Sequence, residues 1–262
     1  MRDWNGTAEA YDRSFATLCD GTVERILTDL PGGSLLDVGC GSGRLSAAAE
    51  ASGRQVTAVD ADASMLDVAR RRLRGTVLRG ALPELPVEDG DAEVIAANFV
   101  VNHVGRPRAA VRELRRVLRP GGRLAMTIWP AGGAAWSALL SEVFDEAGAV
   151  PQPPDHLPEH EDFERSAAGL AGVARDAGME VLDACDLRWE WRIGPADLWT
   201  GIGAGIAGPG AVHRAQSAPV QAKIRAVFET RTGALVGDDG LLCFPVRAAY
   251  VLAEKREVPR RE

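Results

Sequence analysis

The amino-acid sequence predicts an α/β protein with a parallel sheet, because apolar strand segments alternate with helical segments along the chain. The clearest strand is the run 35–38, where Leu35, Leu36 and Val38 suit a strand buried on both faces. The clearest pair of a helix and a strand is 106–130, where apolar residues recur every three or four positions before a Pro-Gly-Gly break. At 262 residues, the chain has the size of one large domain or of a domain with a cap.

Composition and charge favour a protein that acts on a small molecule. Apolar residues make up 46% of the chain and charged residues 26%, which is typical of a globular protein. The net charge of −7 disfavours nucleic acid as a partner, because nucleic-acid binding relies on clustered Lys and Arg. No stretch approaches the ~18 apolar residues of a membrane helix, and the polar start lacks a signal core. We therefore expect a cytoplasmic protein with no membrane partner, while its oligomeric state is not predicted.

The first 33 residues are expected to form a helical lid. Apolar residues recur at helical intervals over 7–30, and the segment ends at Pro31-Gly32-Gly33. Tyr11 and Phe15 either line a pocket or pack on the sheet, since aromatic residues at helical spacing usually belong to a core.

A glycine-rich turn follows the first strand and predicts a nucleotide-binding site. Asp37 ends the strand, and three glycines alternate after it: Gly39, Gly41 and Gly43. Glycine lets the backbone turn tightly, and the helix that follows points its free N–H groups at the turn. The dinucleotide fingerprint would need glycine at 44 or 46, where Arg44 and Ser46 stand, and the Gly-Lys-Ser/Thr of a phosphate loop is absent.

The second apolar strand, 55–60, ends in Asp60, about 20 residues after the first glycine. A carboxylate at this position of an α/β nucleotide-binding fold accepts hydrogen bonds from the ribose hydroxyls. The alternative is that Asp60 caps the next helix, but Asp62 and Ser64 can do that instead. The next helix carries a basic run, which we expect on a solvent-exposed face: Arg70, Arg71, Arg72 and Arg74.

This order of features resembles the class I S-adenosylmethionine-dependent methyltransferases, whose motif I is a Gly-x-Gly-x-Gly turn after an acidic residue. The family also shows the Leu-x-Pro-Gly-Gly pattern found at 118–122, where we expect the glycines to stop a helix before a strand over 123–129. The resemblance implies a Rossmann-like, doubly wound sheet of seven strands with the last antiparallel, and S-adenosylmethionine as cofactor. It implies cofactor contacts from Tyr11, Asp37, Gly39, Cys40, Gly41, Gly43, Asp60, Ala61, Met65, Ala81, Leu82, Asn98 and Phe99.

Two positions qualify this resemblance. The family often binds the adenine amine with an acidic residue after the third strand, but this chain has Gly80-Ala81-Leu82 there, so main-chain groups would have to replace it. The fourth strand ends at Asn98-Phe99, where the family lines the site of methyl transfer. Methyltransferases that act on nucleic-acid bases commonly have Pro-Pro and an aromatic next, whereas Val100 and Val101 follow here. A nucleic-acid base is therefore disfavoured as the substrate.

His103 is the candidate catalytic residue, because it follows this strand end and imidazole titrates near neutral pH. It could act as a general base on a phenol, an enol or an acidic carbon. It could equally be a structural residue that bonds a loop carbonyl.

The second half of the chain is expected to complete the core and to cover the substrate. We assign 34–129, 161–192 and 240–255 to the methyltransferase core, and 130–160 and 193–239 to cap insertions. The expected substrate pocket contains Phe15, His103, Trp129, Trp136, His156 and Trp199. His156 and His160 lie among acidic residues on a proline-rich loop without a helical pairing of ligands, and the cysteines form no Cys-x-x-Cys pair, so no metal site is predicted.

The expected function is transfer of the methyl group to an O, N or C nucleophile of a small, mostly apolar molecule, such as a secondary metabolite. The sulfonium already activates the methyl, so the protein mainly has to align the reactants and exclude water. One alternative is a methyltransferase-like fold that uses the cofactor non-catalytically or for a cyclisation. Another is a nicotinamide oxidoreductase, which Arg44 disfavours.

Overall fold

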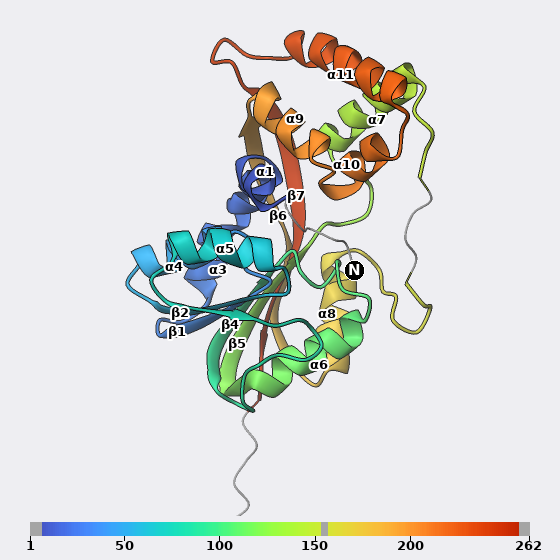
Figure 1. Ribbon diagram of the computed structural model, residues 1–262. Coiled ribbons are helices and arrows are strands. Elements are labelled where there is room, and N and C mark those ends of the chain that lie inside the picture. Colours follow the sequence, from blue (N-terminus) through green and yellow to red (C-terminus); the bar gives the residue numbers. More distant parts are fainter. Residues whose placement is uncertain (1–6, 153–156, 257–262) are drawn as a thin grey trace, which may run out of the picture.

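The protein is built on one seven-stranded sheet with the strand order β3-β2-β1-β4-β5-β7-β6 (Figure 1). The computed structural model describes residues 7–152 and 157–256. The strands are β1 (Ser34–Val38), β2 (Gln55–Asp60), β3 (Thr76–Arg79), β4 (Ala92–Asn98), β5 (Leu118–Ile128), β6 (Glu180–Ile193) and β7 (Leu242–Glu254). Strand β7 runs antiparallel to both of its neighbours, β5 and β6, and the remaining pairs are parallel. The predicted fold class is confirmed.

Helices cover both faces of the sheet and form a separate group beyond one end of it (Figure 1). The first half contributes α1 (Ala8–Arg13), α2 (Phe15–Cys19), η1 (Asp20–Thr22), α3 (Val23–Asp29), α4 (Arg44–Ala51), α5 (Ala63–Arg72) and α6 (Pro107–Val117). The second half contributes α7 (Ala135–Ala147), α8 (Ala167–Asp176), α9 (Pro195–Gly203), α10 (Ala207–Arg214) and α11 (Ala218–Gly233). No helix in the described part of the chain is long and apolar enough to cross a bilayer.

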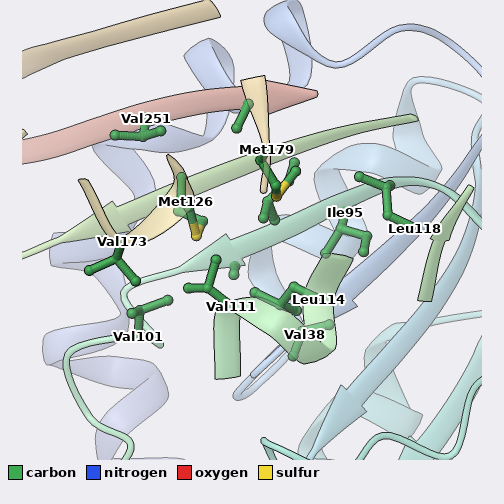
Figure 2. Packing of buried hydrophobic residues seen from close by; sticks show 14 of the residues in the cluster. Val38, Ile95, Val101, Val111, Leu114, Leu118, Met126, Val173, Met179 and Val251 are labelled. Carbon is green, nitrogen blue, oxygen red and sulfur yellow. The ribbon is translucent and has the colours of Figure 1, made fainter. Parts of the chain in front are cut away.

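Strand residues alternate between two cores, as the period of two in a strand requires. Ile95 and Met126 face α6 and α8, where they pack with Leu114 (Figure 2). Their neighbours Val94 and Ala125 face α3 and α4 on the other side. Both faces of the central strands are therefore buried, which explains why these strands read as nearly continuous apolar runs.

The strand order reverses between β1 and β4, because β2 and β3 extend the sheet on one side and β5 on the other. In open α/β sheets, ligands bind at such a switch point, outside the carboxyl ends of the strands. Asp37 lies in β1 close to its carboxyl end, and Asp60 and Asn98 end β2 and β4. The fold thus gathers these three predicted site residues at one edge of the sheet.

The Pro-Gly-Gly segment lies inside β5, which corrects the expectation that it stops the preceding helix. Helix α6 already ends at Val117, and Leu118 is extended, with φ −73° and ψ 133°. The C-terminal end of the chain supplies the reason: Gly121 N–H donates to the carbonyl of Lys255, and Lys255 N–H donates to that of Gly122. This long-range pairing draws the segment into the sheet.

Strands β6 and β7 continue beyond the rest of the sheet as a two-stranded ribbon. Residues 249–254 of β7 pair with β5, whereas 242–254 pair with β6. The ribbon reaches the helices α7, α9, α10 and α11 at the top of Figure 1, which we call the cap. Apolar residues of the ribbon and the cap share one cluster, which includes Trp191, Phe244 and Leu198.

Candidate active site

The turn after β1 is shaped by its three glycines. Gly39, Gly41 and Gly43 have φ of 70°, 54° and 82°, in the left-handed region that favours glycine. The main-chain N–H groups of Gly39 and Cys40 donate to the carbonyl of Val59 at 2.7 and 3.0 Å, which joins the turn to β2. A Cβ on Gly39 would also lie 2.5 Å from Cγ2 of Val100, so a side chain there would displace the loop after β4.

Asp60 receives one main-chain hydrogen bond on each carboxylate oxygen. Gly41 N–H donates to Oδ2 at 2.8 Å, and Asp62 N–H donates to Oδ1 at 2.9 Å. Each oxygen therefore keeps lone-pair capacity for one more donor. Burial raises the pKa of Asp60. The N-terminus of α5 is capped by Asp62, whose Oδ1 accepts from Ser64 N–H at 2.8 Å, so Asp60 is not the helix cap.

Asp37 is the most deeply buried carboxylate near the turn, with 1% of its surface exposed. Ser46, in the first turn of α4, donates its hydroxyl hydrogen to Oδ2 of Asp37 at 2.6 Å. Burial raises the pKa of Asp37 to about 6, although the hydrogen bond from Ser46 opposes this rise. Asp37 thus ties β1 to α4 and titrates above the usual range of a carboxyl group.

Helix α1 covers the glycine turn and the start of α5. Cε1 of Tyr11 lies 3.4 Å from the position that a Cβ on Gly41 would take. The ring also packs with Ala8, Met65 and Val68. Burial raises the pKa of Tyr11 well above its ordinary value, and nearby Asp60 adds to this rise. Tyr11 and Met65, both predicted cofactor contacts, therefore lie together over the turn.

Arg72 is half-buried and joins α5, α1 and the turn, which corrects the expectation that the whole basic run faces solvent. Its guanidinium donates to both carboxylate oxygens of Asp12, at 2.9 and 2.8 Å, and to the carbonyl of Ser42 at 2.7 Å. The Ser42 hydroxyl donates to Asp12 at 2.6 Å. Burial alone would raise the pKa of Asp12, but the hydrogen bonds from Arg72 and Ser42 outweigh it and lower that pKa. Arg71 forms an exposed pair with Glu9.

Asn98 joins the end of β4 to η1 and β5. Its Oδ1 accepts from the hydroxyls of Thr22 and Thr127, at 2.8 and 2.6 Å, and its Nδ2 donates to the carbonyl of Cys19 at 3.4 Å. Phe99 follows with φ of 57°, a left-handed conformation that is rare for an aromatic residue. Such backbone strain concentrates at functional sites, so this position supports the predicted site of reaction.

A row of aromatic rings begins at Phe99. Its ring stacks on Trp129 with a centroid distance of 3.8 Å and an interplanar angle of 14°. Trp129 lies 6.2 Å from Trp189 of β6. The Trp189 ring in turn lies against Gly21 of η1, so closely that a Cβ on Gly21 would overlap it. We call Phe99, Trp129 and Trp189, with the main chain of Gly21, the aromatic row.

A second aromatic group joins α2, α7 and β6. Phe15 lies 5.7 Å from Trp136 and 6.2 Å from Trp191, measured between ring centroids. The Trp191 indole N–H donates to Oγ1 of Thr17 at 2.9 Å. By contrast, the buried Nε1 atoms of Trp136 and Trp189 have no hydrogen-bond partner among the described residues. A buried donor without a partner costs about 1–3 kcal/mol, so these two groups need an explanation.

His103 is half-buried in the loop that follows β4. Its main-chain N–H donates to the carbonyl of Val100 at 2.8 Å, and its Nε2 lies 3.4 Å from Nδ2 of Asn102. The Oδ1 atom of Asn102 is buried without a partner in the described chain. His103 therefore lies at the predicted edge of the sheet, and its role as a base stays a prediction.

The remaining predicted residues lie in three places. Ala81 and Leu82 follow β3, where Gly80 N–H donates to the carbonyl of Asp60 at 3.0 Å, and Ala61 directly follows Asp60. The Trp199 ring contacts His213 and Phe228 within the cap, at centroid distances of 5.3 and 5.1 Å. His156 lies outside the described residues. Among the described residues, no group of three or more His, Cys, Asp and Glu side chains could hold a metal ion.

The sequence-based site missed Asp12, Ser42, Arg72, Gly21 and Trp189. Asp12 and Arg72 are 60 positions apart in the sequence, and Gly21 and Trp189 are still further apart. No local motif therefore indicates that these residues are in contact. The only available signal was the alternation of Trp189, Trp191 and Ile193 on one face of a strand.

Comparison with known proteins identifies the family. A model described as "Methyltransferase domain" matches residues 36–126, from β1 to β5. The chain is 35% identical over 130 residues to a demethylmenaquinone methyltransferase of Clavibacter sepedonicus, an alignment that covers 45% of this chain and 53% of that protein. It is 30% identical over 171 residues to a ubiquinone biosynthesis O-methyltransferase of Xanthomonas oryzae pv. oryzae, covering 63% of this chain and 70% of that protein.

The matched part is thus only about half the length of the first of these relatives. Among solved structures, the YcgJ protein of Bacillus subtilis superposes with a TM-score of 0.57 at 18% identity, covering 91% of this chain and 100% of that chain. This likeness supports the fold, while the sequence relatives and the family model carry the assignment. The chain belongs to the class I S-adenosylmethionine-dependent methyltransferases.

Proposed function

We propose that the protein transfers the methyl group of S-adenosylmethionine to an O, N or C nucleophile of a small, mostly apolar molecule. The observation that carries this proposal is the Asp60 carboxylate beside the turn 39–43. Each of its oxygens accepts one main-chain N–H and keeps capacity for a ribose hydroxyl. The aromatic row begins at the neighbouring strand end, where an acceptor would meet the methyl group.

The chemistry of the described residues fits this cofactor. Asp60 would accept the ribose hydroxyls, and the glycine turn would admit the amino acid portion close to the main chain. Met65 and Tyr11 pack together beside the turn, where the adenine would lie against apolar groups. Asp37 lies 1% exposed behind the turn and holds it through Ser46. We propose that Asp37 organises the site from behind the turn, in place of the direct cofactor contact that the resemblance implies.

In the proposed reaction, the sulfonium of the bound cofactor supplies an already activated methyl group. The residues of this chain then have to align the acceptor and exclude water, which lowers the barrier through proximity. Helix α1 covers the turn through Tyr11 and the pair of Asp12 with Arg72, and the cap is expected to cover the acceptor. His103 would remove the proton of an acidic acceptor.

The relatives support a small acceptor. The matched proteins include a demethylmenaquinone methyltransferase, a ubiquinone biosynthesis O-methyltransferase and a malonyl-[acyl-carrier protein] O-methyltransferase. The net charge of −7 and the uncharged rings beside β4 agree with an apolar molecule rather than a nucleic acid.

Calorimetry with S-adenosylhomocysteine tests the cofactor assignment, and we expect stoichiometric binding. Incubation with methyl-labelled S-adenosylmethionine and a panel of phenols, amines and activated carbon acids tests the reaction. Label in an organic product together with released S-adenosylhomocysteine would support methyl transfer. Tight binding with a rearranged, unlabelled product would support cyclisation instead.

His103 can be tested separately from cofactor binding. With a labelled acceptor in hand, His103→Ala is expected to lower turnover about 10²-fold to 10⁴-fold and to abolish the fall in rate at low pH. S-adenosylhomocysteine should bind this variant as it binds the parent. An unchanged pH profile would assign His103 a structural role.

A further inference from the structure

Two buried indole N–H groups, one in the aromatic row and one in the second aromatic group, have no partner in the described part of the chain. Nε1 of Trp189 and Nε1 of Trp136 are buried and unpaired among the described residues. Trp191 lies two positions from Trp189 on the same face of β6, and its N–H reaches Thr17 at 2.9 Å. The indole N–H of Trp191 thus has a partner within the protein, as a purely structural tryptophan requires. The two unpaired donors are explained if a bound molecule supplies their acceptor.

Trp189 is the donor that lies closer to the expected point of reaction. Its ring is 6.2 Å from Trp129, which stacks on Phe99 at the end of β4. The Trp189 ring also lies against Gly21, and the neighbouring Thr22 donates to Asn98. Contacts with η1 and with Trp129 therefore fix the position of the ring.

The surroundings of this donor define the chemistry of its ligand. The aromatic row consists of uncharged groups, so an anionic carboxylate or phosphate that contacted only these groups would be buried without a counter-ion, which is costly. A neutral carbonyl or phenolic oxygen can accept from an indole N–H without that cost. Flat rings pack favourably beside other aromatic rings, in stacked or edge-on arrangements.

We infer that the methyl acceptor is a neutral, flat, conjugated molecule that carries a carbonyl or phenolic oxygen, and that Trp189 binds this oxygen through Nε1. Trp189 is then a specificity-determining residue, and Trp136 offers a second donor beside Phe15. This inference rests on the proposed function and names the class of molecule that it acts on.

Three probes with the same ring separate the parts of this inference: naphthalene, 1-naphthol and 1-naphthoate. Binding is measured by calorimetry to the full chain saturated with S-adenosylhomocysteine. We expect 1-naphthol to bind about tenfold more tightly than naphthalene, and 1-naphthoate to bind most weakly. Equal binding of naphthol and naphthalene, preferred binding of the carboxylate, or no binding of any probe would overturn the inference.

The variant Trp189→Phe keeps an aromatic ring and removes the N–H. It is expected to bind naphthalene as the parent does and to lose the tenfold preference for 1-naphthol. Trp191→Phe is the matched control, because its N–H has a partner in Thr17: it should melt at a lower temperature but keep the preference. A preference that persists in Trp189→Phe would contradict the role of Trp189.

Binding of S-adenosylhomocysteine provides the reference for both variants. If the parent binds S-adenosylhomocysteine but shows no preference for 1-naphthol over naphthalene, the inference about the acceptor fails and the proposed methyltransferase function stands. If the parent does not bind S-adenosylhomocysteine, the proposed function itself fails. The variant Trp136→Phe tests the second donor. If Trp136→Phe lost the preference for 1-naphthol and Trp189→Phe kept it, the oxygen would bind at Trp136, which would contradict the assignment to Trp189.

Discussion

The cofactor side and the acceptor side of the site satisfy their polar groups in opposite ways. Around the glycine turn, main-chain and side-chain donors are paired within the protein, as in the hydrogen bonds from Gly41 to Asp60 and from Ser46 to Asp37. On the proposed acceptor side, the rings of Phe99, Trp129 and Trp189 pack in a row, and the indole N–H of Trp189 has no partner among residues 7–152 and 157–256. The cofactor side is thus organised within the protein itself, whereas we propose that a ligand completes the acceptor side.

This difference matches what each side has to recognise. All members of the family bind the same methyl donor, so a preorganised turn can be shared among them. The acceptor differs between relatives, and the family model accordingly ends at residue 126, before the cap helices and β6. Substrate choice is therefore expected to reside in the part of the chain that the family model does not match.

The largest effect is expected for Asp60→Ala, which tests whether the cofactor side depends on this carboxylate. Removing two charge-assisted hydrogen bonds should weaken S-adenosylhomocysteine at least about 100-fold in calorimetry. Asp62→Asn is the control, because asparagine caps a helix as well as aspartate does. If Asp60→Ala bound the ligand as tightly as the parent, the ribose assignment would be wrong.

The second effect concerns the stability of the cofactor side and depends on pH. Burial raises the pKa of Asp37 to about 6 in the folded chain, so this carboxyl takes up a proton on folding at mildly acidic pH. Its stabilising contribution is complete below about pH 4 and is lost as the pH rises through 6. The variant Asp37→Asn has no carboxyl group at this position, so its stability lacks this pH-dependent contribution.

Urea unfolding of the ligand-free protein at pH 4 and pH 7.5 measures this change. Relative to the parent, the free energy of unfolding of Asp37→Asn should increase by about 3 kcal/mol between the two pH values. A difference between the two proteins that is independent of pH would show that the carboxyl is not buried as described.

Gly21→Ala tests the acceptor side by overpacking. The new Cβ would overlap the Trp189 ring, and the displacement should cost about 2 kcal/mol of stability. Gly32→Ala is the matched control, because a Cβ there has no atom within 4 Å. S-adenosylhomocysteine should bind both variants equally well in calorimetry, and weaker binding to Gly21→Ala would show that the two sides are not separable.

The smallest effect is expected for Asp12→Asn, which loosens the attachment of α1 to α5 and the glycine turn. Losing the charge opposite half-buried Arg72 should lower the free energy of unfolding by about 1 kcal/mol in urea. Asp67→Asn, which breaks an exposed pair with Arg70, should have no measurable effect. Equal effects of both changes would mean that the Asp12 pair is as weak as a surface pair.

Local signals predicted the backbone geometry around the glycine turn well. The glycines require left-handed φ, a strand end carries Asp60, and the helix cap at Asp62 follows from residue types within a few positions. The sheet could also be predicted, because buried parallel strands read as apolar runs. Such features depend on neighbours in sequence, so sequence alone reveals them.

Features that depend on distant partners could not be predicted. Arg72 looked like one member of a solvent-exposed basic run until the fold brought Asp12 beside it. The Pro-Gly-Gly segment looked like a helix stop until Lys255 paired with its glycines. Gly21 gave no signal at all, because its small size matters only where Trp189 crosses it.

The position of helix α1 connects the binding of the cofactor with the binding of the acceptor. It contacts α5 through Asp12 and Arg72, and it contacts the cap helix α9 through the pair of Arg13 with Asp197 (Figure 1). A cofactor that held α1 in this position would therefore also stabilise the contact of α1 with the cap. Linkage makes such an effect reciprocal: cofactor and acceptor should raise each other's affinity by the same factor.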